Sequence, residues 1–346
     1  MIIQKTVPPL KILQWVWFHL MWLTIWSASA VAVYEFSGYG WLMSIPWLPL
    51  SLVGTAVAFY VGFKNNSAYD RMWEARKIWG AIVNSSRAWG AAVRGYVSNQ
   101  FTEQDEEDAH LHSVQQRLVY RHLAWLYALR SQLLVVKEWE HAAQTGATGR
   151  QARHYQQQYG VGLIDDEITK VELSQLIPPD EIEQTINFKN TATQIIDRQA
   201  QDLKELRRLD LIDDFRHMEL QKLLYDFYVH QGKAERIKNF PLPRQYANMS
   251  SIFIGIFILL LPFGMATEFA NMGEYGTWWS IPFSALVGWV FVMMEVVGDY
   301  SENPFQGMAN DIPMFSLCRT IEIDLREMLG ESDLPPAVAS KNGILM

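Results

Sequence analysis

Residues 250–298 read SSIFIGIFILLLPFGMATEFANMGEYGTWWSIPFSALVGWVFVMMEVVG. The stretch holds two apolar runs, at about 250–270 and 281–298. Each run is long enough to cross a hydrocarbon layer roughly 30 Å thick at a rise of about 1.5 Å per residue. The segment between them contains glycines and acidic residues but no lysine or arginine. The stretch therefore predicts two membrane-spanning helices joined by a short hairpin loop.

The N-terminal part of the chain carries a second pair of apolar runs, at about 13–33 and 46–63. The segment between them, residues 34–40, again has an acidic residue but no basic one. Charged residues make up 19% of the whole chain, and most of them lie in the insert that separates the two pairs. We therefore predict an all-α integral membrane protein with four transmembrane helices in two hairpins and a large helical cytosolic region.

The basic residues indicate the orientation of the four spans. No lysine or arginine occurs between Lys11 and Lys64 or between Arg244 and Arg319, and basic residues gather just outside these limits. Because cytoplasmic segments carry the excess of lysine and arginine, both termini and the insert are predicted to be cytoplasmic. The first apolar run is longer than the roughly 7–15 residues of a signal-peptide core, so it is expected to remain as an anchor.

The insert shows helical rather than strand periodicity, with leucines recurring at steps of three and four near residues 118–134 and 203–211. A polar passage at 144–160 is expected to be a loop, and the segment from Leu334 onward a mobile tail. The predicted division of the chain has four parts: 1–63, with the first hairpin; 64–244, the helical cytosolic domain; 245–299, the second hairpin; and 300–346, a cytosolic C-terminal segment.

Catalytic and metal-binding motifs are absent from the sequence: it has no phosphate-binding glycine loop, no His-Glu-x-x-His and no Gly-x-Ser-x-Gly. The single Cys318 excludes an intrachain disulfide, and His110 and His112 are two residues apart, a spacing that favours surface histidines over a metal site. His19 and Glu295 lie in predicted spans, where each is either a packed or interfacial polar group or a functional one. No enzyme activity, cofactor, metal or nucleic-acid partner is predicted.

The second predicted span carries a distinctive stripe. Thr55, Phe59 and Phe63 follow one another at steps of four and so share one face of an α-helix. In a symmetric oligomer such a stripe would form rings around the axis, and hydrophobic rings gate pores by dewetting. The alternative is that these side chains face lipid or pack in a core, and periodicity alone favours that alternative.

The sequence after this stripe, GFKNNSAYDRMWEARKIWG at 62–80, resembles the bacterial branch of the bestrophin family. Further segments similar to the family follow in order, at 197–200, 211–216, 235–246, 302–305, 310–313 and 317–326. The resemblance thus covers nearly the whole chain. It implies a homopentameric ion channel in the lipid bilayer of the cell inner membrane, with a central pore that passes a transmembrane neck and then a cytosolic vestibule.

The resemblance also implies which residues line that pore. The three neck rings correspond to Thr55, Phe59 and Phe63, and the cytosolic aperture corresponds to Phe215. Thr55 departs from the family, in which an aliphatic residue is more usual. Animal members hold calcium in an acidic cluster after Asn-Pro-Phe, where this chain has Gln306 to Asp311 with Met308 at one acidic position. Since calcium prefers six to eight oxygen ligands, a calcium-independent pore is expected.

The sign of the permeant ion stays open at this point. The family favours chloride or other anions, whereas bacterial members need not, and the rings named above are uncharged. A net charge of -8 would favour cations such as sodium if it were concentrated in the vestibule, whereas the basic segment from Lys64 to Lys77 would favour anions. A non-conducting membrane scaffold would need no such pore axis.

Overall fold

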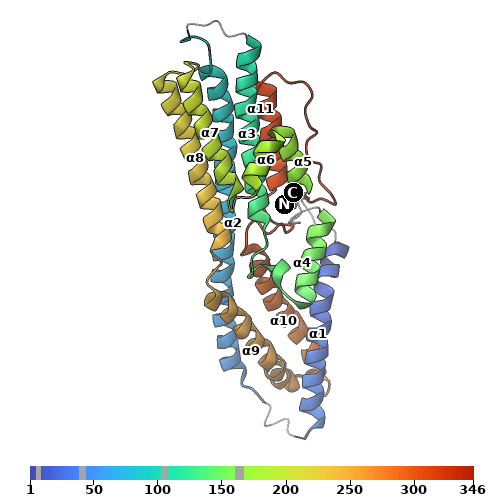
Figure 1. The fold of residues 1–346 in the computed structure, drawn as a ribbon. Coiled ribbons are helices and arrows are strands. Elements are labelled where there is room, and N and C mark those ends of the chain that lie inside the picture. Colours follow the sequence, from blue (N-terminus) through green and yellow to red (C-terminus); the bar gives the residue numbers. More distant parts are fainter. Residues whose placement is uncertain (5–8, 39–43, 103–107, 160–166) are drawn as a thin grey trace. The chain divides into compact units, whose positions relative to one another are not determined.

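The computed structural model describes residues 1–4, 9–38, 44–102, 108–159 and 167–346 (Figure 1). The helices are α1 (Pro9–Phe36), α2 (Trp47–Tyr96), α3 (Asp108–Leu134), α4 (Gly146–Tyr159), α5 (Glu167–Leu176), α6 (Pro179–Ile186), α7 (Thr191–Arg208), α8 (Asp214–Asn239), α9 (Arg244–Phe269), α10 (Gly276–Ser301) and α11 (Met314–Met328), with short 3-10 turns at His141–Ala143 and Ala270–Met272. Within the described ranges the β-structure amounts to two isolated bridges, so the all-α prediction is confirmed. The prediction of a loop at 144–160 is wrong, because Gly146–Tyr159 forms the helix α4 despite its polar composition.

The chain folds as two compact units. The membrane unit comprises Gln4–Arg71 and Pro241–Asn303. The helical unit comprises Met1–Ile3, Met72–Phe240 and Pro304–Met346.

The membrane unit contains the predicted spans. In the described part of the chain, four helices are long and apolar enough to cross a membrane, at Val16–Phe36, Trp47–Tyr96, Arg244–Met272 and Gly276–Ser301, which confirms the two predicted pairs. Helix α10 packs against α9 and α1, and α1 also contacts α9. The core between them is small and apolar, and its fully or nearly fully buried members are Leu23, Leu50, Val57, Val61, Ile254, Phe257, Ile258, Leu261, Met265 and Ala285.

Helix α2 is longer than the sequence indicates. The predicted span ends near Phe63, but the helix, which has 50 residues in all, continues without a break to Tyr96. Its residues up to Arg71 belong to the membrane unit and the rest to the helical unit. The continuation is amphipathic, because buried residues such as Ala75, Ile78 and Ile82 recur at steps of three and four among polar ones.

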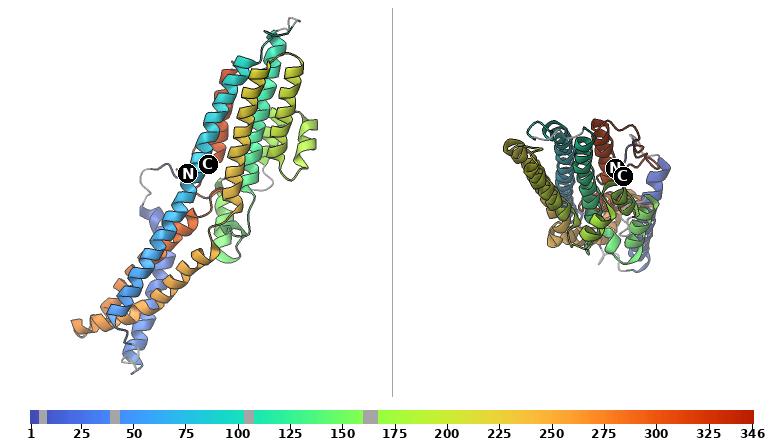
Figure 2. Two further views of the ribbon diagram at one scale, coloured as in Figure 1. Left: turned by 90° about the vertical axis from the view of Figure 1, so that its left-hand side faces the viewer. Right: turned by 45° about the horizontal axis from the view of Figure 1, so that its top comes forward.

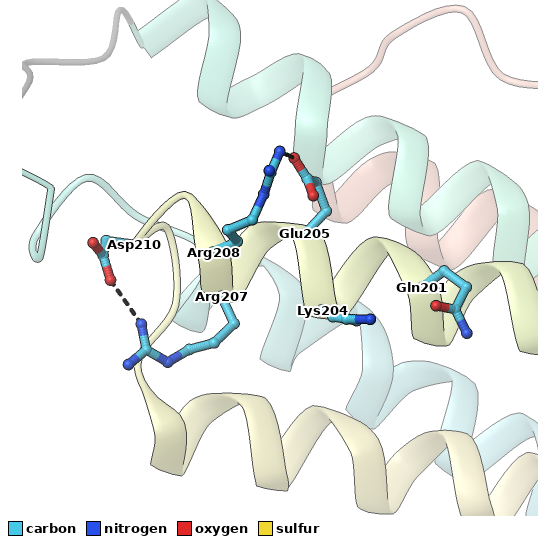
Figure 3. Close-up of a pocket in the computed structure, with 6 residues that line it drawn as sticks. All are labelled: Gln201, Lys204, Glu205, Arg207, Arg208 and Asp210. Carbon is cyan, nitrogen blue, oxygen red and sulfur yellow. Dashed lines mark hydrogen bonds and ion pairs between the residues drawn. The ribbon is translucent and has the colours of Figure 1, made fainter.

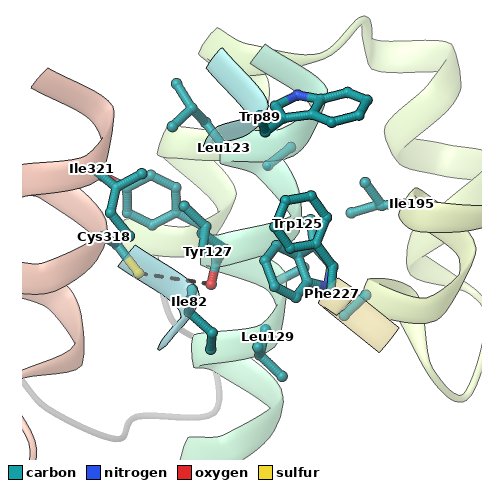
Figure 4. Close-up of a cluster of buried hydrophobic side chains, with 14 of the residues drawn as sticks. Ile82, Trp89, Leu123, Trp125, Tyr127, Leu129, Ile195, Phe227, Cys318 and Ile321 are labelled. Atoms are coloured by element: carbon teal, nitrogen blue, oxygen red, sulfur yellow. Dashed lines mark hydrogen bonds between the residues drawn. The ribbon is translucent and has the colours of Figure 1, made fainter. Parts of the chain in front are cut away.

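The helical unit is built around α3, which packs against α5, α7, α8 and α11 (Figures 1 and 2). Its large core includes the aromatic group in Figure 4, in which the rings of Trp125 and Phe227 lie 5.0 Å apart between centroids. The neighbouring Trp89 and Tyr127 are also fully buried. Burial of several large rings within one core makes this unit a substantial hydrophobic body.

The prediction of a mobile tail from Leu334 onward is wrong for its last residues. Ile344 and Met346 are 8% and 9% exposed and belong to the core of the helical unit. Backbone hydrogen bonds join Ile3 N to Gly343 O (3.0 Å) and Ser316 N to Met346 O (2.9 Å). The apolar side chains at the end of the chain anchor this segment to the helical unit. The prediction failed because it rested on the prolines at the start of the segment and not on its apolar last residues.

Candidate functional site

The predicted stripe lies on the open face of α2. Phe59 and Phe63 are 68% and 53% exposed in the single chain, and Thr55 is exposed as well. The two phenylalanine rings meet edge to face with centroids 4.7 Å apart. The three residues therefore form one continuous surface that no other part of the described membrane unit covers.

The opposite face of α2 is packed. Val57 and Val61 are buried in the core of the membrane unit, and Lys64 continues their line one turn further on. A Cβ atom on Gly54 would lie 2.7 Å from Phe257 Cε2, so this glycine permits the close approach of α9. Since one face is fixed against α9 and the rest of the unit, the stripe is held pointing away from them.

The exposed face changes character along the helix. After Phe63 it continues through Asn66 and Asp70, which are both exposed. The face is thus apolar as far as Phe63 and polar beyond it, as expected where a helix leaves the hydrocarbon layer.

The hydroxyl of Thr55 is engaged within its own helix. Thr55 Oγ1 donates to the carbonyl oxygen of Ser51 at 2.9 Å, and Ser51 Oγ donates to Leu48 O at 2.8 Å. A hydroxyl has one proton and two lone pairs. The part of the Thr55 hydroxyl left for other partners is therefore an acceptor, and the rest of the side chain is a methyl group.

Lys64 is paired with Glu295, a contact that the sequence did not lead us to expect. Lys64 Nζ lies 2.6 Å from Glu295 Oε1, and the side chain of Lys64 is 1% exposed. The sequence places Lys64 in a basic segment near the neck and offers no partner for Glu295. Two signals could have indicated the pair. The two residues have opposite charges and lie at the ends of predicted spans, and Lys64 falls in register with the buried Val57 and Val61.

Phe215 lies at the start of α8 in the helical unit and is 81% exposed. The turn before it is firmly built, because Leu211 and Ile212 are buried and the side chain of Asp213 caps the helix by accepting from Arg216 N at 2.7 Å. Arg216 in turn donates to Tyr96 O at 3.1 Å. Phe215 is therefore an ordered, outward-facing ring; its place on the same ion path as the α2 stripe remains a prediction.

Charged side chains surround this turn. Arg207 bonds to Asp210 at 2.7 Å and to Asp214 at 2.6 Å, and Figure 3 shows the open pocket that Arg207 and Asp210 line with Gln201, Lys204, Glu205 and Arg208. The hydrogen bond from Arg207 lowers the pKa of Asp214. The acidic and basic groups beside Phe215 are thus paired with one another.

In the loop after Asn-Pro-Phe, the carboxylate oxygens accept hydrogen bonds from amides of the loop itself. The carboxylate of Asp311 accepts from Phe305 N (2.9 Å), Gly307 N (2.8 Å) and Ile312 N (2.7 Å). The buried ammonium of Lys238 contacts Phe305 O at 3.2 Å and also pairs with Glu140. Burial raises the pKa of Asp311, while these amide donors oppose the rise. Calcium independence remains a prediction, and these bonds support it because a metal would have to displace them.

The remaining candidate residues have ordinary surroundings. His19 accepts a hydrogen bond from Trp22 Nε1 of the same helix at 3.4 Å, and His110 and His112 are exposed. Among the residues that the structure describes, no group of three or more histidine, cysteine, aspartate or glutamate side chains is placed to hold a metal ion. Cys318 is fully buried, and burial raises its pKa to about 12.

Comparison with known proteins places this arrangement in a family. Relatives include a voltage-dependent anion channel-forming protein of Mesorhizobium japonicum, 28% identical over 83% of this chain and 76% of its own length, and one of Escherichia coli, 24% identical over 84% and 79%. A crystal structure of a bacterial bestrophin homologue from Klebsiella pneumoniae has the same fold, with a TM-score of 0.71 and 22% identity over 91% of this chain and 98% of that one. The family described as bacterial/fungal bestrophin protein matches residues 7–327, and the chain belongs to that family.

Proposed function

We propose that five copies of this chain form an ion channel that passively conducts chloride and other small anions across the cell inner membrane. Thr55, Phe59 and Phe63 form the rings of its neck, Phe215 forms a second constriction on the cytosolic side, and both termini and the helical unit are cytoplasmic. The observation that carries the proposal is the α2 stripe, which is exposed in the single chain while the opposite face is packed.

A ring of phenylalanines is suited to a gate. Five copies of Phe59 and Phe63 around one axis would line a short apolar passage, from which water is readily expelled. The edge-to-face contact at 4.7 Å fixes each ring against its neighbour on the same helix. An ion would cross the neck when the rings move apart enough to wet the passage. This transport requires no catalytic group.

The names of the relatives favour anions, since the proteins of Mesorhizobium japonicum and Escherichia coli are both described as forming voltage-dependent anion channels. One observation favours a sodium-conducting channel of the same architecture as the second candidate. Because Thr55 donates its proton to Ser51, the neck offers acceptor oxygens at that level, and acceptors suit cations better than anions.

Reconstitution into planar bilayers tests the proposal. With a gradient of sodium chloride, an anion channel gives a reversal potential near that of chloride and a cation channel one near that of sodium. The purified protein in detergent is expected at about 200 kDa, five times the 39.9 kDa of one chain. A protein of the expected mass that carries no current would favour the scaffold. A different mass would contradict the pentamer.

A further inference from the structure

Lys64 and Phe63 are neighbours in the chain but point to different surroundings. Phe63 is 53% exposed, whereas the side chain of Lys64 is 1% exposed. Successive residues of an α-helix are turned by about 100°, so the ring faces the open side while the ammonium enters the packed side. There its Nζ lies 2.6 Å from Glu295 Oε1 of α10. A charged pair therefore sits at the inner end of the proposed neck without lining it.

The carboxylate of Glu295 is built into a polar site. Ser250 Oγ lies 2.8 Å from Oε1 and 2.9 Å from Oε2, and Ser251 Oγ lies 2.7 Å from Oε1. An ionised carboxylate only accepts, and its two oxygens offer about four positions for donors. Ser250 Oγ also lies 2.8 Å from Ala247 O and has a single proton for these three oxygens, so Lys64 and Ser251 supply the other donors to Glu295 Oε1. With Lys64 positive and Glu295 negative, the pair itself carries no net charge.

The charge balance of this pair matters because the sequence before the neck carries no other basic side chain for a long distance. Lys64 is the first lysine or arginine after Lys11, and the stripe itself is uncharged. Away from bulk water a lone charge acts over a long distance, and the field of a close ion pair falls off much faster. Removing one partner would expose the charge of the other to the passage in every subunit.

We propose that the pairing of Lys64 with Glu295 keeps the inner end of the neck electrically neutral and thereby sets the balance between anion and cation permeation. The inference rests on the proposed channel function. It assigns to these two residues a specificity role, exerted through the field and without contact with the ion. Loss of the acid is expected to favour anions, and loss of the base to favour cations.

Reversal potentials of three variants test this role. Glu295→Gln keeps the acceptor for the serines and is expected to raise the ratio of chloride to sodium permeability roughly tenfold, the low end of the enrichment that charge of one sign produces in a narrow cleft. Lys64→Met is expected to lower the ratio by a similar factor. The double variant should return close to the wild-type value. Currents of all variants are recorded in the same sodium chloride gradient as those of the wild type.

The control is Lys189→Met, which removes the same charge from an exposed position of the helical unit and should leave the ratio unchanged. Shifts in the same direction from both single variants, or no shift from either, would overturn the inference. If a single variant does not assemble, channels mixed with an excess of wild-type subunits give the same measurement with a smaller shift. A wild-type protein without current would reject the channel function itself.

Discussion

Phe59 and Phe63 are exposed apolar side chains on the face of α2 that continues into the exposed polar residues Asn66 and Asp70. Their rings contact each other edge to face, with centroids 4.7 Å apart, and form one apolar patch. Leu259 and Phe283 of the same unit are also exposed. A hydrophobic segment that ends in polar groups is what a gate between two water-filled spaces requires.

Truncating both rings should therefore open the passage. Phe59→Ala together with Phe63→Ala removes the apolar surface that expels water, so the single-channel conductance or the open probability is expected to rise several-fold. Single-channel recording in planar bilayers measures both quantities. Phe283→Ala, which shortens an exposed ring of α10, is the control. Unchanged currents in the double variant would place the barrier elsewhere.

His122 is a second residue with a measurable consequence. Its ring is 4% exposed, accepts or donates a hydrogen bond with Ser86 Oγ at 2.9 Å and lies 4.4 Å from the ring of Phe227 between centroids. Burial lowers its pKa to about 3, from an ordinary value of 6.5. The unfolded chain thus binds a proton below pH 6.5 that the folded chain does not, so this residue destabilises the fold progressively as the pH falls from 6.5 toward 3.

Between pH 7.5 and pH 5 the contribution of His122 should lower the free energy of unfolding by about 2 kcal/mol. His122→Phe keeps the ring contacts and removes the titrating group, so its melting temperature should fall less over the same interval. Thermal unfolding in detergent at the two pH values gives the comparison. His112→Gln removes an exposed histidine and is expected to behave like the wild type. Equal acid sensitivity of His122→Phe would argue against a buried neutral imidazole.

At the scale of elements, the packing of α2 against α9 decides where the stripe points. Phe257 is 4% exposed and its ring lies 4.5 Å from that of Phe291, so it has little room to yield to a side chain at position 54. Gly255 of α9, by contrast, would have no atom within 4 Å of a new Cβ. The two glycines therefore differ in what an added methyl group meets.

Gly54→Ala should destabilise the membrane unit by about 1–3 kcal/mol, because the methyl group forces Phe257 or the helices apart. Gly255→Ala should be neutral or stabilising by up to about 1 kcal/mol, since alanine favours the helix and meets open space. Melting temperatures of the two purified variants in detergent test the difference. A Gly54→Ala protein as stable as the wild type would mean that α2 and α9 can separate without cost.

The elements were largely predictable from the sequence, whereas their contacts were only partly so. Four apolar runs and their helical periodicity are local properties, and the structure contains the corresponding helices. The continuation of α2 to Tyr96 was missed because the change in composition after Phe63 resembles a domain boundary. The pairing of Lys64 with Glu295 joins residues 231 positions apart, and a periodic pattern does not show which distant side chain a buried charge will meet.

At the scale of the whole molecule, the proposed path contains two constrictions, the neck on α2 and the ring of Phe215 on α8. Resistances on one path add, so widening one constriction leaves the other to limit the current. The proposal therefore predicts a relation between variants that neither constriction alone would give. This relation does not depend on which ion permeates, because the resistances of the two constrictions add for anions and cations alike.

Phe215→Ala and the paired change Phe59→Ala with Phe63→Ala should each raise the conductance, and the triple variant should gain more than the sum of the two separate gains. Val229→Ala, at an exposed apolar position of α8 further from its start, is the control for a general effect on that helix. Single-channel conductances are measured in symmetric salt for the wild type, the two separate variants, the triple variant and the control. A triple variant that conducts no better than the neck variant would mean that Phe215 does not limit the path, and the single barrier would then be the neck on α2.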